Sequence, residues 1–307
     1  MGKPPKVGIV LLNWNNYSDT ADCLLSLDQI SYENYFVVVV DNGSSDGSAE
    51  QLSTEFDWCD FVFNDENLGF SGGCNVGIDH AMSNGADYVL LLNNDIEVSS
   101  DFLEPLVSTA EKNNRVAAVG GIIFDGHSDE IWDAGGEMQP FFANHRKYTS
   151  KQSSKAYRTE FVTCAMNLLS EEFLKDHRLD EEFFFGVEEI DLSWRATDDD
   201  WKLFINPNSK VYHEVGSATD HMFSGESLFS PFQKYHNTRG RLYHSRKNLR
   251  LYHTVFFYMA VIFIYPFIYI GMGAIYDRFD ILRAHLLSIY DYFIGSEVRQ
   301  PQYFEEY

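Results

Sequence analysis

Short apolar runs alternate with amphipathic stretches along the first third of the chain. The apolar runs are too short for buried helices and therefore predict buried strands; they cover residues 6–12, 35–40, 59–63 and 88–92. Between them, helical spacing of apolar residues predicts helices over residues 18–27, 49–56 and 71–82, with Ser18 and either Ser45 or Asp46 as N-caps. This alternation is typical of parallel βαβ units. The sequence therefore predicts an α/β fold with a Rossmann-like, mostly parallel sheet flanked by helices.

Polar residues follow three of these strands at the point where each one ends. Asn13 follows the first strand, Asp41 the second, and Asn93, Asn94 and Asp95 follow the strand of residues 88–92. Because carboxyl ends of parallel strands meet at one edge of a sheet, these residues should border one crevice. The dinucleotide fingerprint GxGxxG does not follow the first strand, which favours a mononucleotide. The alternative is that they are ordinary loop residues of such a domain.

Two features of this edge suggest particular contacts. A carboxylate held by a stiff strand, as expected for Asp95, is a hard oxygen ligand suited to Mg²⁺ or Mn²⁺ carrying phosphates. A Gly-rich loop from Asn67 to Gly73 lets backbone approach a bound group closely. The alternative for residues 93–95 is a turn and an N-cap for a helix expected over residues 101–113.

The pattern loosens after residue 113. Strands are expected at residues 116–124, 160–169, 201–205 and 210–213, and a short helix at residues 171–176. Residues 131–136 are rich in turn formers, and residues 141–155 form a polar loop that is a candidate acceptor-side loop. His213 ends the last strand, where a lone histidine is more often structural than a ligand.

An acidic helix is expected within residues 182–195, EFFFGVEEIDLSWR. Glu188 and Asp191 share one helical face, Asp191 can pair with Arg195, and Glu189 faces elsewhere. After three phenylalanines, one of these carboxylates can lie partly desolvated at the helix N-terminus, where burial raises its pKa and the helix dipole lowers it. The alternative is an acidic first turn that only caps the helix.

Composition restricts the class of protein. The 307 residues include 46 acidic and 23 basic residues, a formal charge of −23, which argues against a nucleic-acid partner because a phosphate backbone requires a basic footprint. The four cysteines show no metal-binding spacing, so reduced thiols in a cytosolic domain are expected. The N-terminal MGKPPK contains no apolar signal-peptide core.

Taken in order, these segments resemble the family 2 glycosyltransferases, which have the GT-A fold. The resemblance covers Lys6 to about Ser217, and its closest subgroup by pattern is the rhamnosyltransferase-like one that acts on lipid-linked glycans. The matching segments are IVLLNWNN, VVVVDNGSSDGS, NLGFSGGCNVGI, LLLNNDIEV at the DxD motif, FFFGVEEIDLSWR at the Glu-Asp catalytic helix, and VYHEVGS at the late His segment.

The resemblance implies an inverting transfer of sugar from a nucleotide-diphosphate sugar to a lipid-linked saccharide. It implies nucleotide-sugar contacts from six residues: Asn13, Asp41, Asn67, Gly69, Asn93 and Asn94. Mg²⁺ or Mn²⁺ would be held by Asp95, aided by His213, and Glu189 would be the general base, with Glu188 in contention. The sequence departs from the family at Asn93, where the first DxD carboxylate is missing, and at Glu189, where the family usually has Asp.

Other classes of protein fit part of the pattern. A nucleotidyltransferase also uses a Rossmann-like sheet and a metal, but does not need a late acidic helix aligned with a histidine. A non-catalytic partner protein that binds nucleotide sugars would tolerate Asn93. A processive polysaccharide synthase is disfavoured, because the chain contains no Gln-x-x-Arg-Trp sequence and no series of membrane spans.

The C-terminal part differs from the rest. Residues 1–230 are expected to form the catalytic domain and residues 231–307 a helical region, in which residues 255–276 carry no charge and are long enough to cross a hydrocarbon core of about 30 Å. A basic cluster precedes them at Arg239, Arg241, Arg246, Lys247 and Arg250, which predicts attachment to the cell membrane with the catalytic domain facing the cytoplasm.

Two features argue against a simple membrane span. Pro266 interrupts the apolar segment, and residues 277–294 are amphipathic, with Leu282, Leu286, Ile289 and Phe293 on one stripe. This pattern favours a broken, re-entrant or in-plane arrangement. The alternative is a buried helical hairpin that packs on the catalytic domain or in a homodimer.

Overall fold

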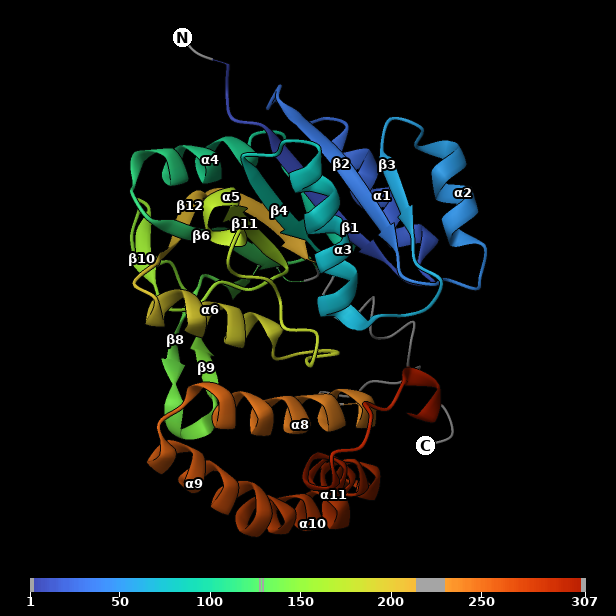
Figure 1. The fold of residues 1–307 in the computed structure, drawn as a ribbon, viewed down its shortest axis with the longest axis vertical. Coiled ribbons are helices and arrows are strands. Elements are labelled where there is room, and N and C mark those ends of the chain that lie inside the picture. Colours follow the sequence, from blue (N-terminus) through green and yellow to red (C-terminus); the bar gives the residue numbers. More distant parts are fainter. Residues whose placement is uncertain (1–2, 127, 129, 214–229, 305–307) are drawn as a thin grey trace.

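A ten-stranded mixed sheet forms the centre of the molecule in the computed structural model, which describes residues 3–126, 128, 130–213 and 230–304 (Figure 1). The strands are β1 (Val7–Asn13), β2 (Tyr35–Asp41), β3 (Asp60–Phe63), β4 (Tyr88–Leu92), β5 (Ile96–Val98), β6 (Val116–Asp125), β7 (Ile131–Asp133), β10 (Tyr157–Thr159), β11 (Met166–Ser170) and β12 (Lys202–His213). Their order is β10-β12-β6-β11-β4-β1-β2-β3, with β5 paired to β12 and β7 to β6. The neighbours β4, β1, β2 and β3 are parallel, as predicted, whereas β11 is antiparallel to β4 and β6.

Helices cover both faces of this sheet (Figure 1). They are α1 (Tyr17–Leu27), α2 (Ser48–Glu55), α3 (Gly69–Ser83), α4 (Leu103–Lys112), α5 (Glu171–Leu174) and α6 (Glu188–Asp198). The alternation of side chains along β1 separates two cores: Ile9 packs with Leu24 of α1 and Leu106 of α4, whereas Val10 packs on the other face with Ile78 of α3. The sheet is therefore the middle of three layers.

Close packing against the sheet positions α3. A Cβ atom on Gly77 would lie 2.3 Å from Val10 Cγ1 and 3.0 Å from Val40 Cγ2, both on stiff β-branched side chains. A side chain at this position would push the helix away from β1 and β2. Glycine thus keeps the middle of α3 close to β1 and β2.

Several local predictions need correction. The N-cap of α1 is Asn16, whose side chain accepts from Asp19 N, and not Ser18. Helix α2 begins after Gly47 without a side-chain cap, so neither Ser45 nor Asp46 caps it. The loops after β1 and β2 contact each other through Asn15, whose N donates to Ser44 Oγ and whose Oδ1 accepts from Ser45 N.

The larger corrections concern residues 131–213. Residues 131–136 do not form only turns but contribute β7 and the start of a hairpin, β8 (Gly136–Gln139) and β9 (Asn144–Lys147), with the short helix η1 (Pro140–Phe142) between them. The strand expected at 160–169 is shorter, because only Met166–Ser170 reaches β4. The two strands expected at 201–205 and 210–213 are one strand, β12, interrupted by a bulge.

A layer of helices lies below the sheet in Figure 1. It contains α8 (Pro231–Asn248), α9 (Leu251–Met259), the π-helical segment η2 (Ala260–Ile264), α10 (Tyr265–Tyr276), α11 (Phe279–Ile294) and the short helix η3 (Pro301–Phe304). Pro266 has no backbone N–H to donate to the preceding turn. The π-helical segment directly before it accommodates the missing hydrogen bond, so residues 251–276 remain one helical run. Helix α11 packs along α8 and α10.

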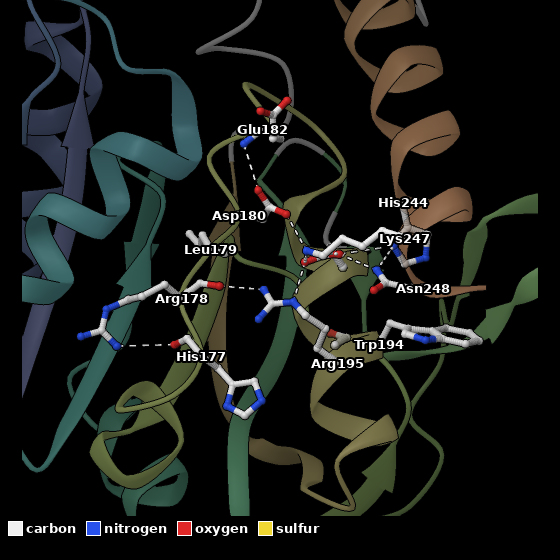
Figure 2. A network of polar contacts seen from close by, with 12 residues as sticks. His177, Arg178, Leu179, Asp180, Glu182, Trp194, Arg195, His244, Lys247 and Asn248 are labelled. Carbon is white, nitrogen blue, oxygen red and sulfur yellow. Dashed lines mark hydrogen bonds and ion pairs between the residues drawn. The ribbon is translucent and has the colours of Figure 1, made fainter. Parts of the chain in front are cut away.

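A buried carboxylate on α6 joins this layer to the part of the molecule that contains the sheet. Asp191 of α6 accepts from Arg195 Nε at 2.6 Å, from Asn248 Nδ2 at 2.6 Å and from Lys247 Nζ at 3.3 Å. Figure 2 shows Arg195 of α6 and Lys247 and Asn248 of α8 converging at this point. Burial by itself would raise the pKa of Asp191, but His244, Arg195 and Lys247 together hold it below its usual value.

Asp191→Asn should destabilise the protein by roughly 1.5–3 kcal/mol at pH 7, because it weakens the charge-assisted hydrogen bonds from Arg195 and Lys247, which are only partly buried. Since the folded pKa of Asp191 lies below the unfolded value, its contribution is present at neutral pH and is lost as the pH falls below about 4. The difference between wild type and variant should therefore narrow in acid, as measured by thermal unfolding. Asp198→Asn, exposed on the same helix, is the matched control. Equal effects of the two substitutions would contradict the role of Asp191.

Candidate active site

Asn13 and Asp41 lie side by side at the carboxyl edge of the sheet, where the register of β1 and β2 pairs them. Asn13 Nδ2 donates to Asp41 Oδ1 at 2.9 Å, and Thr20 Oγ1 donates to Asn13 Oδ1 at 2.9 Å. The side chain of Asn13 is fully buried, so its hydrogen bond holds Asp41 from the interior of the protein. Asp41 Oδ2 also accepts from Ser44 N at 2.9 Å, which fixes the loop after β2. A direct contact between Asn13 and a nucleotide stays a prediction.

The Gly-rich loop is built around Asn67 and Gly69. Asn67 Oδ1 accepts from Gly69 N at 2.8 Å and from Asn42 Nδ2 at 3.0 Å. Gly69 has a φ of 75°, and a Cβ atom there would lie 2.6 Å from the carbonyl oxygen of Phe184, so the turn requires glycine. Because Phe70 N donates to the same carbonyl at 2.8 Å, this loop is tied to the segment that leads into α6.

A cavity of about 330 Å³ lies where β4 ends and α6 begins. It brings together six of the predicted site residues, Asn93, Asn94, Asp95, Glu188, Glu189 and His213. The other four do not line it: Asn13 ends β1, Asp41 ends β2, and Asn67 and Gly69 lie between β3 and the first turn of α3. The predicted sites therefore form two adjoining groups along one edge.

Asp95 and His213 form the polar centre of this cavity. His213 Nε2 lies 2.9 Å from Asp95 Oδ1, and both side chains are almost fully buried. The pairing of β5 with β12 brings them together, because it sets His213 opposite Ile96. Nδ1 of His213 makes no hydrogen bond within the described residues, and residues 214–217 of the VYHEVGS motif lie outside them. Within the described residues there is no group of three His, Cys, Asp or Glu side chains that could hold a metal ion.

The two glutamates at the start of α6 have different surroundings. Glu188 is buried, and its Oε2 accepts from Val187 N at 2.9 Å, so its carboxylate covers the helix N-terminus. Burial, together with the neighbouring Glu189, raises the pKa of Glu188 to about 7. Glu189 Oε2 accepts from Thr163 Oγ1 at 2.8 Å and from Cys164 N at 2.9 Å. Burial raises the pKa of Glu189, and these two hydrogen bonds oppose that rise.

Sequence reasoning missed three residues beside this cavity. Trp132 lines it, with its ring 4.8 Å from the ring of His213. Lys147 Nζ lies 3.4 Å above the Trp132 ring, and burial lowers the pKa of this lysine. Burial raises the pKa of the neighbouring Asp133 to about 7. They lie on β7 and β9, within stretches expected to be turns and loop, and only the high aromatic and charged content of those stretches could have suggested them.

Comparison with known proteins supports one family. The family model "Glycosyl transferase family 2" matches residues 9–178, more than half of the chain. The chain is 34% identical to glycosyltransferase AglE of Haloferax volcanii over 122 residues, which are 38% of this chain and 39% of AglE. It is 19% identical to dTDP-rhamnosyl transferase RfbF of Shigella flexneri over 78% of this chain and 79% of that protein.

Two solved structures share the fold. The mannosyltransferase PcManGT from Pyrobaculum calidifontis, in complex with GDP-Man and Mn²⁺, aligns over 95% of this chain and 88% of its own, with a TM-score of 0.57 and 13% identity. GalNAc-T7 with UDP, GalNAc and Mn²⁺ aligns over 68% of this chain and 44% of its own, with a TM-score of 0.58 and 17% identity. Together with the match of the family model, these likenesses confirm the predicted resemblance: the chain belongs to glycosyl transferase family 2, a family of glycosyltransferases with the GT-A fold.

Proposed function

We propose that the protein transfers a sugar from a nucleotide-diphosphate sugar to a hydroxyl group of a lipid-linked saccharide, with inversion at the anomeric carbon. The observation that carries this proposal is the single cavity that contains both the Asp95–His213 pair and Glu189. Transfer needs a countercharge for the departing diphosphate and a base for the acceptor hydroxyl, and these groups can supply them. The name of dTDP-rhamnosyl transferase RfbF, and the GDP-Man and UDP bound in the two similar structures, support a nucleotide-sugar donor.

Glu189 is the proposed general base. Both of its hydrogen bonds fall on Oε2, which leaves Oε1 to take the proton from the acceptor hydroxyl. The raised pKa makes Glu189 a better proton acceptor than an exposed glutamate. Glu188 remains the alternative, but its carboxylate is turned to the backbone of its own helix, which fits a capping role better.

The Asp95–His213 pair is the proposed site for a divalent cation. One carboxylate oxygen and one imidazole nitrogen lie 2.9 Å apart at the edge of the cavity, so both can be ligands of one cation. A nitrogen ligand favours Mn²⁺ over Mg²⁺. When bound, the cation would balance the charge that builds on the diphosphate. Asn93 and Asn94 would contact the donor beside it, and Asp41 and the loop at Asn67 and Gly69 would hold the nucleoside.

We further propose that residues 1–230 form the catalytic domain and that the helical layer after them lies in the plane of the cell membrane, on its cytoplasmic side. Helix α11 supports this because its polarity is inverted: His285, Ser288 and Asp291 are fully buried, while Leu286 and Phe293 are half exposed. The helical run of residues 251–276 is also apolar and exposed: only 17% of its most apolar 18-residue stretch is buried. We define the apolar face as the exposed side chains Val255, Phe256, Met259, Phe263, Ile264, Phe267, Ile268, Leu286, Tyr290 and Phe293.

Charge supports the same placement. Residues 231–304 contain nine Lys or Arg and four Asp or Glu, although the whole chain has a formal charge of −23. Of the predicted basic cluster, Arg246 and Arg250 are exposed and can reach anionic headgroups. Lys247 instead binds Asp180 and Asp191, and Arg241 binds backbone carbonyls, so these two hold the layer together.

Glu189→Gln should abolish sugar transfer while donor binding survives, because glutamine keeps the volume and hydrogen bonds but cannot accept a proton. The measurement compares transfer of radiolabelled sugar into a membrane extract with binding of the nucleotide sugar. Glu188→Gln is the matched control and should retain transfer. If Glu188→Gln is the inactive variant, the assignment of the base is wrong by one residue.

Asp95→Asn should lower the transfer rate on the order of a hundredfold or more, the typical loss when a main electrostatic stabiliser is removed. The variant should also bind Mn²⁺ more weakly, which can be measured directly by paramagnetic resonance of the free ion. Asp101→Asn is the control, because Asp101 is an exposed aspartate shortly after β5. Unchanged turnover of Asp95→Asn, or full activity in EDTA, contradicts a metal at this site.

Phe256→Glu combined with Phe267→Glu should reduce binding of the full chain to phosphatidylglycerol vesicles at least tenfold in a flotation assay, because each charge opposes burial among lipid. Phe63→Glu, an exposed phenylalanine on edge strand β3, is the control and should float as the wild type does. A wild-type protein that stays dimeric in solution and does not float shows that a second copy covers the apolar face.

A further inference from the structure

Three basic side chains form a row between the apolar face and the candidate base. Lys234 and Arg241 lie seven residues apart on one side of α8, about 10 Å along its axis. Arg241 Nε donates to the carbonyl of Ala143 at 3.1 Å, and its Nη2 donates to that of Phe142, directly before β9. Lys147 ends β9, and we call Lys234, Arg241 and Lys147 the basic row.

At the inner end of the row, no carboxylate of the described residues pairs with Lys234 or Arg241. Lys234 is only 9% exposed, donates to the hydroxyl of Tyr269 and lies 4.2 Å from the centre of that ring. Arg241 contacts backbone carbonyls and lies 5.1 Å from the Phe257 ring. Within the described residues, neither cation forms an ion pair with a carboxylate. Desolvating a lone charge is costly, and burial lowers the pKa of Lys234 to about 7, so an anion bound beside this lysine would stabilise its charged form.

The outer end of the row reaches the active-site cavity. Lys147 Nζ lies 3.4 Å above the Trp132 ring, and Trp132 lines the cavity together with Glu189. Lys147 is near enough to Glu189 for each charge to influence the pKa of the other. An anionic molecule that follows the row from α8 would therefore bring its other end beside the base.

We propose that the basic row binds the phosphate groups of the acceptor, an amphiphile whose hydrocarbon lies on the apolar face and whose sugar reaches Glu189. The proposal rests on the proposed function, since it assumes that the acceptor is lipid-linked. Lysine and arginine retain free N–H donors at both positions, and phosphate oxygens are their usual ligands. An ordinary bilayer headgroup would meet the exposed Arg246 and Arg250 first, whereas Lys234 lies beneath α10.

The test measures binding of farnesyl diphosphate and of farnesol to the full chain by calorimetry in EDTA, which prevents the diphosphate from binding a metal at Asp95. Wild type should bind farnesyl diphosphate at least tenfold more tightly than farnesol or inorganic pyrophosphate. Lys234→Met should lose about tenfold in affinity for farnesyl diphosphate, as expected for one charge-assisted contact, while Lys234→Arg should keep most of it. Lys112→Met, on exposed α4, should bind as the wild type does.

Folding and source of the phosphate are checked separately. The thermal midpoint of Lys234→Met should not fall, because methionine removes an unpaired buried charge at similar volume. Its flotation on phosphatidylglycerol vesicles should equal that of the wild type. Equal affinity of wild type and Lys234→Met for farnesyl diphosphate overturns the proposal, and so does a loss confined to phosphatidylglycerol vesicles, which would assign the row to bilayer headgroups. A wild-type protein that binds farnesyl diphosphate as expected but transfers no sugar from any nucleotide sugar would contradict the proposed function and not the site.

Discussion

The ion cluster around Asp191 determines how the two parts of the molecule are arranged. Helix α6 carries the candidate base at its first turn and Asp191 two residues later, so the contacts of Asp191 with Lys247 and Asn248 fix the rotation of α6 about its axis. With that rotation fixed, Glu189 meets Thr163 and Cys164. One buried carboxylate thus connects the geometry of the cavity to the packing of the helical layer.

Two adjacent glutamates acquire different properties from the same helix. Position 188 points back over the N-terminal N–H groups, where a negative charge is favoured by the helix dipole but opposed by burial and by the second carboxylate. Position 189 is held by donors from outside the helix, on the segment before β11. Only the positions of these donors distinguish the two residues, since both have the same side chain.

The parallel half of the sheet could be predicted because buried strands have a local signature. Residues 88–92 agree with β4 at both ends, and the predicted first two strands agree with β1 and β2 within one residue. The hairpin of β8 and β9 has no such signature, because its strands are short and half exposed and their pairing depends on distant residues. Likewise, residues at strand ends could be assigned to the site, whereas Trp132 and Lys147 reach it only through that hairpin and the register of β7.

The bulge in β12 gives the site an unusual sensitivity to chain length. Between Ile205 and Lys210 the strand advances five residues while its partner β6 advances two, and the extra residues set which face of the sheet each later side chain takes. Deleting a single residue between these positions would reverse the alternation and turn His213 away from Asp95, although neither residue would be changed. Relatives that keep the pair of Asp95 and His213 should therefore conserve the length of residues 206–209 more strictly than their sequence, although this sequence resembles an ordinary polar turn.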